Sequence, residues 1–253
     1  MKEILLSARG VKKEFPGRNE KEQVLKSIDV DIYEGDFTVI MGSSGAGKST
    51  LLYALSGMDS ITDGKVLYRG EEISGYRERQ MAKLRSHEFG FVFQQTHLVS
   101  NLSLFENVAV AGYLDSQKTA KAVREKAEKL LEKMNVTSAR DRLPSEVSGG
   151  EAQRAAIARA VINNPGLLFA DEPTGALNKR NTKEVLNLLT TLNESGQSIL
   201  MVTHDIHAAI RGTRILYLED GKILDEMRFP VFQDTDAKNR EKKLSEWLSA
   251  LAW

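Results

Sequence analysis

A glycine-rich stretch that ends in a lysine and two hydroxyl residues has the residue types and spacing of a phosphate-binding loop. It consists of Gly42, Ser43, Ser44, Gly45, Ala46, Gly47, Lys48, Ser49 and Thr50. Glycines let the backbone curl so that its amide groups point at a phosphate, and a following helix adds the positive end of its dipole. Lys48 would reach the β- and γ-phosphates, and Ser49 would offer its hydroxyl to Mg2+. A tight Gly/Ser turn is the alternative interpretation.

Two adjacent acids form a second candidate group. Asp171 and Glu172 follow the apolar run Leu167–Ala170, which reads as a buried strand. One carboxylate can hold the hydration shell of Mg2+, and the next can orient the water that attacks a γ-phosphate. An acidic pair is more often a solvated turn, but the apolar run before it disfavours that interpretation.

A second glycine loop lies between these two groups. Ser148, Gly149, Gly150 and Glu151 precede a helix rich in alanine and arginine, so they form another anion site at a helix start. One nucleotide does not need two such loops. The presence of a second anion-binding loop therefore indicates that this loop contacts a nucleotide bound by another copy of the chain.

Alternating strands and helices are predicted to position these groups. Strands are expected at Phe37–Met41, 89–93, 166–170 and 198–203, and helices from Leu51, at 76–85, from 151 to about 163, and at 179–194. Strands separated by crossover helices form a mostly parallel sheet, whose ligands lie beyond the carboxyl ends of the strands. Lys48, Asp171, Glu172 and His204 all follow strands in this way. The functional groups should therefore meet at one edge of the sheet.

The remaining segments differ in character. Strands are expected at 4–8, 28–32 and 65–68, the last one antiparallel, with a turn and a polar loop at 15–22. Residues 98–144 are mainly helical in pattern, which indicates an inserted helical subdomain at about 98–148 of a domain that spans 1–227. The tail 228–253 ends in an apolar stripe of Leu244, Trp247, Leu248 and Leu251. We expect this helix to pack on the same chain or a second copy; contact with a membrane surface or a permease is the alternative.

Composition limits the possible partners. The chain has 253 residues, 35 basic and 35 acidic, so its net charge of zero gives no field that would attract nucleic acid. Cysteine is absent, which excludes disulfides and thiolate metal sites. The N-terminus is charged too early for a secretion signal, and no apolar run approaches the roughly 18 residues of a spanning helix. We expect a cytoplasmic protein whose membrane attachment, if any, is local or through a partner.

The ordered set of motifs resembles the nucleotide-binding subunit of an ATP-binding cassette (ABC) transporter. The match covers residues 15 to about 227. Its motifs, in chain order, are Walker A at Gly42 to Ser49, the Q-loop at Gln94, the signature at Ser148-Gly149-Gly150, Walker B at Leu167 to Asp171 with Glu172 directly after it, and the switch at His204. The resemblance implies a P-loop NTPase core with a mostly parallel sheet, an antiparallel β subdomain and an inserted α-helical subdomain. It also implies a head-to-tail homodimer that sandwiches two ATP molecules and drives a membrane permease from the inner face of the cell membrane.

The resemblance also assigns roles to single residues. Phe15 would stack on adenine, although a half-buried loop aromatic is the plainer interpretation. Gln94, Ser49 and Asp171 would hold Mg2+, with Gln94 also touching the attacking water. Glu172 is the expected general base, and His204 and Lys48 would contact the γ-phosphate.

This sequence departs from the family pattern at two places. The signature usually reads Leu-Ser-Gly-Gly-Gln, whereas Val147 and Glu151 stand at its ends here. The loop after Walker B usually ends in Asp, but Asn178 stands there, which keeps hydrogen-bonding capacity and loses the charge. We expect tuned affinity from the first change, and the second puts communication between the two ATP sites in question.

Three further stretches of the sequence resemble one subgroup of ABC transporter ATP-binding subunits. The stretches at 91–94, 101–108 and 170–177 resemble macrolide exporters, lipoprotein-release systems, bacitracin-type peptide-resistance systems and the cell-division ATPase. The expected function is therefore an ATPase that drives export or extraction of an antimicrobial peptide, drug or lipid-linked compound, with the permease groove around 96–107. The alternative is a nucleotide-operated switch that regulates a membrane partner without bulk transport. A DNA-repair or translation ATPase is disfavoured because the chain has neither long coiled coils nor two cassettes.

Overall fold

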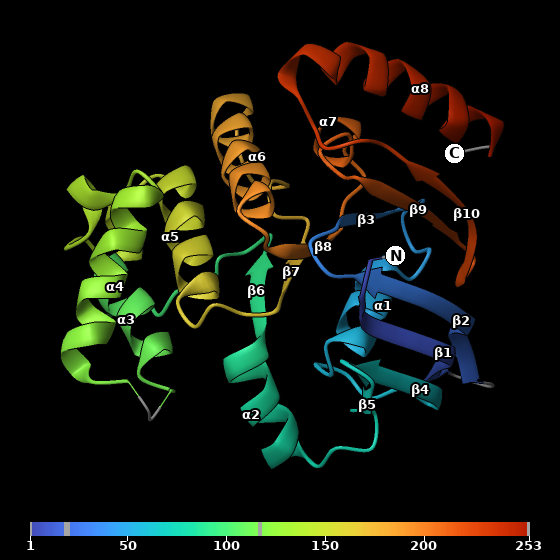
Figure 1. The fold of residues 1–253 in the computed structure, drawn as a ribbon, viewed down its shortest axis with the longest axis horizontal. Helices are drawn as coiled ribbons and strands as arrows, with labels where there is room; N and C mark the ends of the chain where they lie inside the picture. The colour runs from blue at the N-terminus through green and yellow to red at the C-terminus, as the bar shows by residue number, and fades with distance from the viewer. Residues whose placement is uncertain (1, 18–20, 116–117, 252–253) are drawn as a thin grey trace. The chain divides into compact units, whose positions relative to one another are not determined.

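The computed structural model describes residues 2–17, 21–115 and 118–251 (Figure 1). Contacts divide the chain into two compact units, Met1–Met81 with Asn193–Trp253 and Ala82–Leu192. Each unit contains its own part of the sequence motifs, and each is described by itself below. None of the described helices is long and apolar enough to cross a membrane.

The first unit contains both antiparallel and parallel strands. An antiparallel sheet has the order β2 (Lys21–Tyr33), β1 (Ile4–Pro16), β4 (Asp63–Tyr68) and β5 (Glu71–Glu72). The second group has the order β10 (Lys222–Arg228), β9 (Arg214–Glu219), β3 (Phe37–Met41) and β8 (Ser198–Val202). β3 pairs in parallel with both β8 and β9, whereas β10 is antiparallel to β9. The expected antiparallel strand at 65–68 is thus confirmed as part of β4, which pairs with β1.

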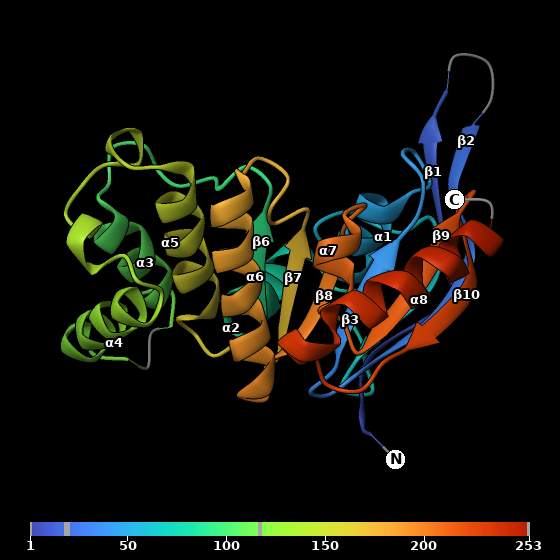
Figure 2. The ribbon, with the colours of Figure 1, turned by 90° about the horizontal axis from the view of Figure 1, so that it is seen from above.

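Burial explains why β3 and β8 read as unbroken apolar runs. Every residue of both strands is buried, as expected for parallel strands that are covered on both faces. The first unit also contains helices α1 (Lys48–Leu55) and α7 (Ile206–Ala209), visible in Figure 2. The strand–loop–helix order predicted around the glycine-rich stretch is therefore present.

Some strands differ from the sequence-based expectation. β1 and β2 are much longer than 4–8 and 28–32, because they pair across their whole length as far as Phe15 with Glu22 and Pro16 with Lys21. The expected turn at 15–17 therefore begins inside a strand, and residues 18–20 of the expected loop lie outside the described residues. Several register shifts between these strands break the alternation by which a long strand is recognised.

The hairpin of β9 and β10 was not predicted at all. Its turn places Asp220 at φ 47° and Gly221 at φ 71°, the two positive angles of a type I′ turn. An added Cβ at Gly221 would lie 2.2 Å from the carbonyl oxygen of Val24, so this position requires glycine. The Asp-Gly pair after the apolar run 215–218 was the available signal.

The second unit combines two strands with the inserted helices. β6 (Phe89–Phe93) pairs in parallel with β7 (Leu167–Asp171), and α2 (Glu78–Glu88) leads into β6. Between the two strands lie α3 (Leu104–Gly112), α4 (Ala120–Lys133), two short 3-10 turns and α5 (Gly149–Val161); α6 (Lys179–Glu194) follows β7. The mainly helical character expected for 98–144 is confirmed. Val123, Ala127, Leu131 and Met134 are buried as the helical spacing predicted, and Leu130 is half-buried.

The C-terminal helix α8 (Ala237–Ala250) packs on its own chain, as the apolar stripe predicted. Leu244 and Leu248 are fully buried. The Trp247 indole nitrogen donates to Asp225 Oδ2 at 2.8 Å, and its ring meets that of Tyr217 edge-on. Arg240 is 2% exposed and donates to the carbonyl oxygens of Ile210 and Gly212, which fixes the start of the helix against the segment after α7.

Candidate nucleotide-binding site

The phosphate loop joins β3 to α1 in the first unit, and two of its glycines, Gly42 and Gly47, lie in close contact with other segments. An added Cβ at Gly42 would lie 1.9 Å from the carbonyl oxygen of Leu218. Gly47 has φ 99° as the N-cap residue of α1, and a Cβ there would lie 3.2 Å from Val24. The backbone can therefore curl tightly in front of the helix, as an anion cradle requires.

The phosphate loop is held by hydrogen bonds from its own lysine, Lys48, and to a carboxylate on β9, Glu219. Lys48 Nζ donates to the carbonyl oxygens of Gly42 at 2.9 Å and Ser43 at 2.7 Å. Ser43 Oγ donates to Glu219 Oε1 at 2.7 Å, and the Tyr217 hydroxyl donates to Glu219 Oε2 at 2.9 Å. The Ser43 hydroxyl, with help from Tyr217 and the charge of Lys48, lowers the pKa of Glu219, although burial opposes this. Burial and the Glu219 contact raise the pKa of Tyr217 to about 12.

Glu219 should make the stability of the first unit depend on pH. Its pKa is lower in the folded protein than the value of about 4.3 in an unfolded chain. Its contribution is therefore fully present above that value and is lost as the pH falls through the folded pKa. We expect Glu219→Gln to lower Tm by about 2 °C at pH 7. The difference from wild type should shrink below about pH 4. Thermal unfolding followed by circular dichroism across this range tests it, and a difference that grows on acidification would contradict it.

The structure places the other predicted residues of the first unit near the end of β1, at the start of α1 and after β8. Ser49 is in the first turn of α1 and is half-buried, while His204 follows β8 after the single residue Thr203 and is exposed. Because Ile40 of β3 is in register with Val202 of β8, the loops after these two parallel strands emerge at the same edge. Phe15 is 38% exposed at the end of β1, with Lys13 Nζ 4.9 Å from its ring centre.

The second unit brings Gln94 and the acidic pair together in the same manner. Phe93 of β6 is in register with Asp171 of β7, so Gln94 and Glu172 each come directly after a neighbouring strand. Asp171 is buried, and Glu172 has a backbone φ of 46°. Such a conformation in a non-glycine residue is costly and concentrates at functional sites. The turn that follows is closed by Gly175, whose N–H donates to the Glu172 carbonyl oxygen at 3.0 Å. An added Cβ at Gly175 would lie 2.9 Å from Gln94 Nε2, so the Gln94 side chain lies against this turn.

The signature residues form the start of α5, two residues earlier than the predicted helix start at 151. Ser148 is the N-cap, and its Oγ accepts from the Glu151 N–H at 3.3 Å while Glu151 Oε2 accepts from the Ser148 N–H at 2.8 Å. This capping box explains why the helix begins at Gly149. Glu151 Oε2 also accepts from Ser148 Oγ at 2.7 Å, and these contacts lower the pKa of Glu151.

Asn178 caps the next helix. Its Oδ1 accepts from the Asn181 N–H at 3.0 Å, and its carbonyl oxygen accepts from the Thr182 N–H at 2.9 Å. Asn and Asp are both good N-cap residues, so the local structure that an aspartate would give is retained. The side chain of Asn181 in turn lies against Gly150 of the signature, because an added Cβ there would be 2.3 Å from Asn181 Cγ.

Comparisons with known proteins identify the family to which this chain belongs. The ABC transporter family profile matches residues 25–175. The lipoprotein-releasing system ATP-binding protein LolD of Aquifex aeolicus is 43% identical over 88% of this chain and 97% of its own length. The bacitracin export ATP-binding protein BceA of Halalkalibacterium halodurans is 37% identical over 91% of this chain and 93% of its own. The macrolide export ATP-binding/permease protein MacB of Pasteurella multocida is 38% identical, but this chain spans only 34% of its length.

A solved structure is similar over nearly the whole fold. The ATP-binding cassette MJ0796, in a dimeric post-hydrolysis state bound to ADP and Pi, has a TM-score of 0.84 and 34% identity, covering 90% of this chain and all of that one. The architecture is therefore that of an ATP-hydrolysing cassette. The chain belongs to the ABC transporter family as an ATP-binding subunit. It is an ATPase of the subgroup that contains macrolide-export, lipoprotein-release and bacitracin-export proteins.

Proposed function

We propose that this ATPase is the motor of a membrane exporter or extraction system for an antimicrobial peptide, drug or lipid-linked compound. The observation that carries the proposal is the similarity to LolD and BceA over 97% and 93% of their lengths, together with the intact phosphate-loop and signature structures. A permease in the membrane would be its partner. The chain would then work at the inner face of the cell membrane and would not act on nucleic acid.

Each ATP would lie between two copies of the chain arranged head to tail. The phosphate loop, residues 42–50, and Phe15 of one copy would bind the nucleotide, and residues 148–151 of the other would cover it. The fit of a triphosphate is supported by the glycine contacts in the loop and by the exposed Ser148 and Gly149 at the start of α5. Phe15 presents an exposed ring for the adenine base.

The donor set also suits magnesium, which would neutralise charge on the phosphates when bound. Ser49, Gln94 and Asp171 would hold it through a hydroxyl, an amide oxygen and a carboxylate, the hard oxygen ligands that Mg2+ prefers. Among the described residues there is no cluster of three or more His, Cys, Asp or Glu side chains that could hold a metal ion. Glu172 would orient the attacking water and accept its proton. His204 and Lys48 would hold the γ-phosphate in position.

A hollow in the second unit is the proposed contact for the permease. It has a volume of about 220 Å³. Its lining includes Phe89, Phe91, Phe93, Ala111, Leu114 and Arg159. The neighbouring apolar side chains Val110 and Tyr113 near the end of α3 are 46% and 45% exposed. The segment 96–107, where the groove was expected, does not line it. Arg159 instead donates to the carbonyl oxygens of Thr96 and His97 and fixes the start of that segment beside the hollow.

Purification from native membranes tests the proposal. Tagged Glu172→Gln protein, incubated with ATP and Mg2+ and gently solubilised, should co-purify with a multi-spanning permease identified by mass spectrometry. Lys48→Ala, which should not retain the nucleotide, is the matched control and should recover much less of it. Recovery of soluble partners alone would contradict the proposal. A permease that stimulates ATP hydrolysis without moving any cargo would favour the alternative of a switch that regulates a membrane partner.

A further inference from the structure

A buried glutamine on α5 connects the two loops that carry Gln94 and Glu172. Gln153 is 1% exposed, and its Nε2 donates to the carbonyl oxygen of Phe93 at 2.9 Å and to that of Pro173 at 2.8 Å. Both hydrogens of the amide are thus used. Because unpaired polar groups are costly in the interior, these bonds hold the side chain and both carbonyls in place.

The two carbonyls are adjacent to the residues proposed to act in hydrolysis. Phe93 immediately precedes Gln94, and Pro173 immediately follows Glu172. One side chain therefore fixes the separation between the end of β6 and the turn after β7. The β6–β7 pairing holds these segments as far as Phe93 and Asp171, and the Gln153 bonds add one contact at Phe93 and one at Pro173, two residues beyond the end of β7.

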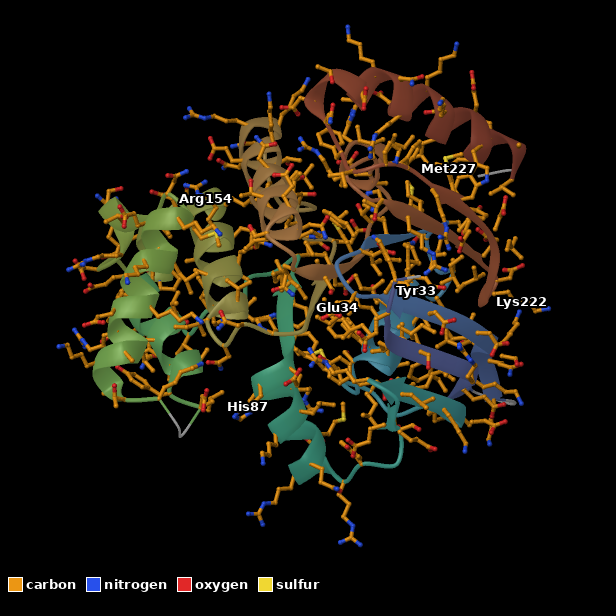
Figure 3. The ribbon with its side chains drawn as sticks, in the orientation of Figure 1. Tyr33, Glu34, His87, Arg154, Lys222 and Met227 are labelled. Carbon is orange, nitrogen blue, oxygen red and sulfur yellow. The ribbon has the colours of Figure 1, made fainter. Side chains whose placement is uncertain are left out.

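The same helix begins with the signature residues. Gln153 lies within one turn of Gly150, and its neighbour Arg154, labelled in Figure 3, anchors the helix elsewhere. Arg154 is 8% exposed and donates to Glu184 Oε2 at 2.8 Å and to the Met134 carbonyl oxygen at 3.0 Å. Because Gly150 and Gln153 lie in the same helix, one turn apart, a small displacement at the signature should move Gln153 as well, against the contacts that Arg154 makes.

We propose that Gln153 is a positioning residue for ATP hydrolysis, which transmits contact at the signature to Gln94 and Glu172 of the same chain. The proposal rests on the roles given above to those two residues. Contact with a nucleotide on the partner copy would set the position of the α5 start, and the two hydrogen bonds of Gln153 would set the positions of both loops. A misplacement of about 1 Å can cost up to 10²-fold in rate, so the bridge does not need to move far.

Gln153→Met tests the bridge because methionine has nearly the same volume and cannot donate. We expect kcat for ATP hydrolysis to fall about 10-fold while KM for ATP changes less than about 3-fold, since the phosphate loop is not altered. The matched control is Ile157→Ala, one turn later on α5, where an equally buried side chain makes no hydrogen bond to either loop. It should lower Tm at least as much as Gln153→Met and leave kcat within about 2-fold of wild type. A Gln153→Met kcat within 2-fold of wild type, or matching effects of both variants on kcat, would overturn the proposal.

A double-mutant cycle separates this inference from the assignment of Glu172. If Gln153 acts through Gln94 and Glu172, adding Gln153→Met to Glu172→Gln should lower single-turnover hydrolysis by less than about 3-fold further. A full additional 10-fold loss in both the Glu172→Gln and the Gln94→Ala backgrounds would show an independent role and contradict the proposal. A near wild-type rate for Glu172→Gln alone would instead remove the role of Glu172, while the single Gln153→Met result still tests the bridge to Gln94. If Gln153→Met does not fold, Gln153→Leu, which has a similar size and also cannot donate, is tested by the same criteria.

Discussion

Replacing Glu172 by glutamine should reduce ATP hydrolysis by about 10²-fold or more, the scale expected for loss of a positioned general base. Gln keeps the size of the side chain and loses the charge and the ability to accept a proton. The backbone of residue 172 has φ 46° directly after a buried strand, which sets the direction of its Cα–Cβ bond, and an isosteric substitution leaves this backbone unchanged. The defect should therefore come from chemistry rather than from rearrangement.

The same variant should accumulate as an ATP-bound dimer, because ATP would still bind and would no longer be cleaved. Steady-state hydrolysis at saturating ATP and Mg2+ gives the rate, and size-exclusion chromatography with ATP or ADP gives the oligomeric state. Glu128→Gln on α4, where the acid is half-exposed, is the matched control and should behave as wild type. Near wild-type turnover by Glu172→Gln would contradict the assignment of the base, whatever its oligomeric state.

The parts of the site that the sequence could predict depend on short-range patterns. The apolar runs of β3, β7 and β8, the glycine-rich loop and the helix after it are each contained in a dozen residues, and the structure has all of them. The helix stripes were also recognisable, because a spacing of three and four places residues on one face. The expected edge position of Lys48 and His204 follows from the pairing of β3 with β8.

The remaining features depend on contacts between residues far apart in the chain. Glu219 holds Ser43 from 176 positions away, and it stands at the end of β9, a strand that was not assigned. The amide of Gln153 bonds to carbonyls 60 and 20 positions away. The spacing of apolar residues shows which face of a helix is buried. A polar residue such as Gln153 is assigned by that pattern to the exposed face, so its burial could not be predicted. The early start of α5 was missed for a local reason, since the reciprocal bonds of Ser148 and Glu151 were available as a capping-box signal.

Gly150→Ala should impair the ATPase strongly, and a second substitution should reverse most of the effect. Gly150 lies in the first turn of α5, where alanine is intrinsically favoured over glycine by up to about 1 kcal/mol. The obstacle is the amide of Asn181, whose Cγ would be 2.3 Å from the new Cβ. Overpacking of this kind costs roughly 1–3 kcal/mol when the neighbouring side chain cannot move aside. Where the strain is relieved by displacing the signature residues, the same energy lost from their contact with the partner's nucleotide corresponds to about 5- to 150-fold in ATP-driven dimerisation and in activity at limiting protein concentration.

Asn181→Ala removes that amide while the backbone N–H that Asn178 caps remains. We therefore expect Gly150→Ala/Asn181→Ala to regain activity to within about 5-fold of wild type, and Asn181→Ala alone to stay within about 3-fold. Hydrolysis rates measured as a function of protein concentration distinguish weak dimerisation from a slow chemical step. If the double variant remains as impaired as Gly150→Ala, the glycine is needed for the approach of a phosphate rather than of Asn181. A rescue would instead show that the second glycine of the signature accommodates the first turn of α6, which joins the signature to the loop that ends in Asn178.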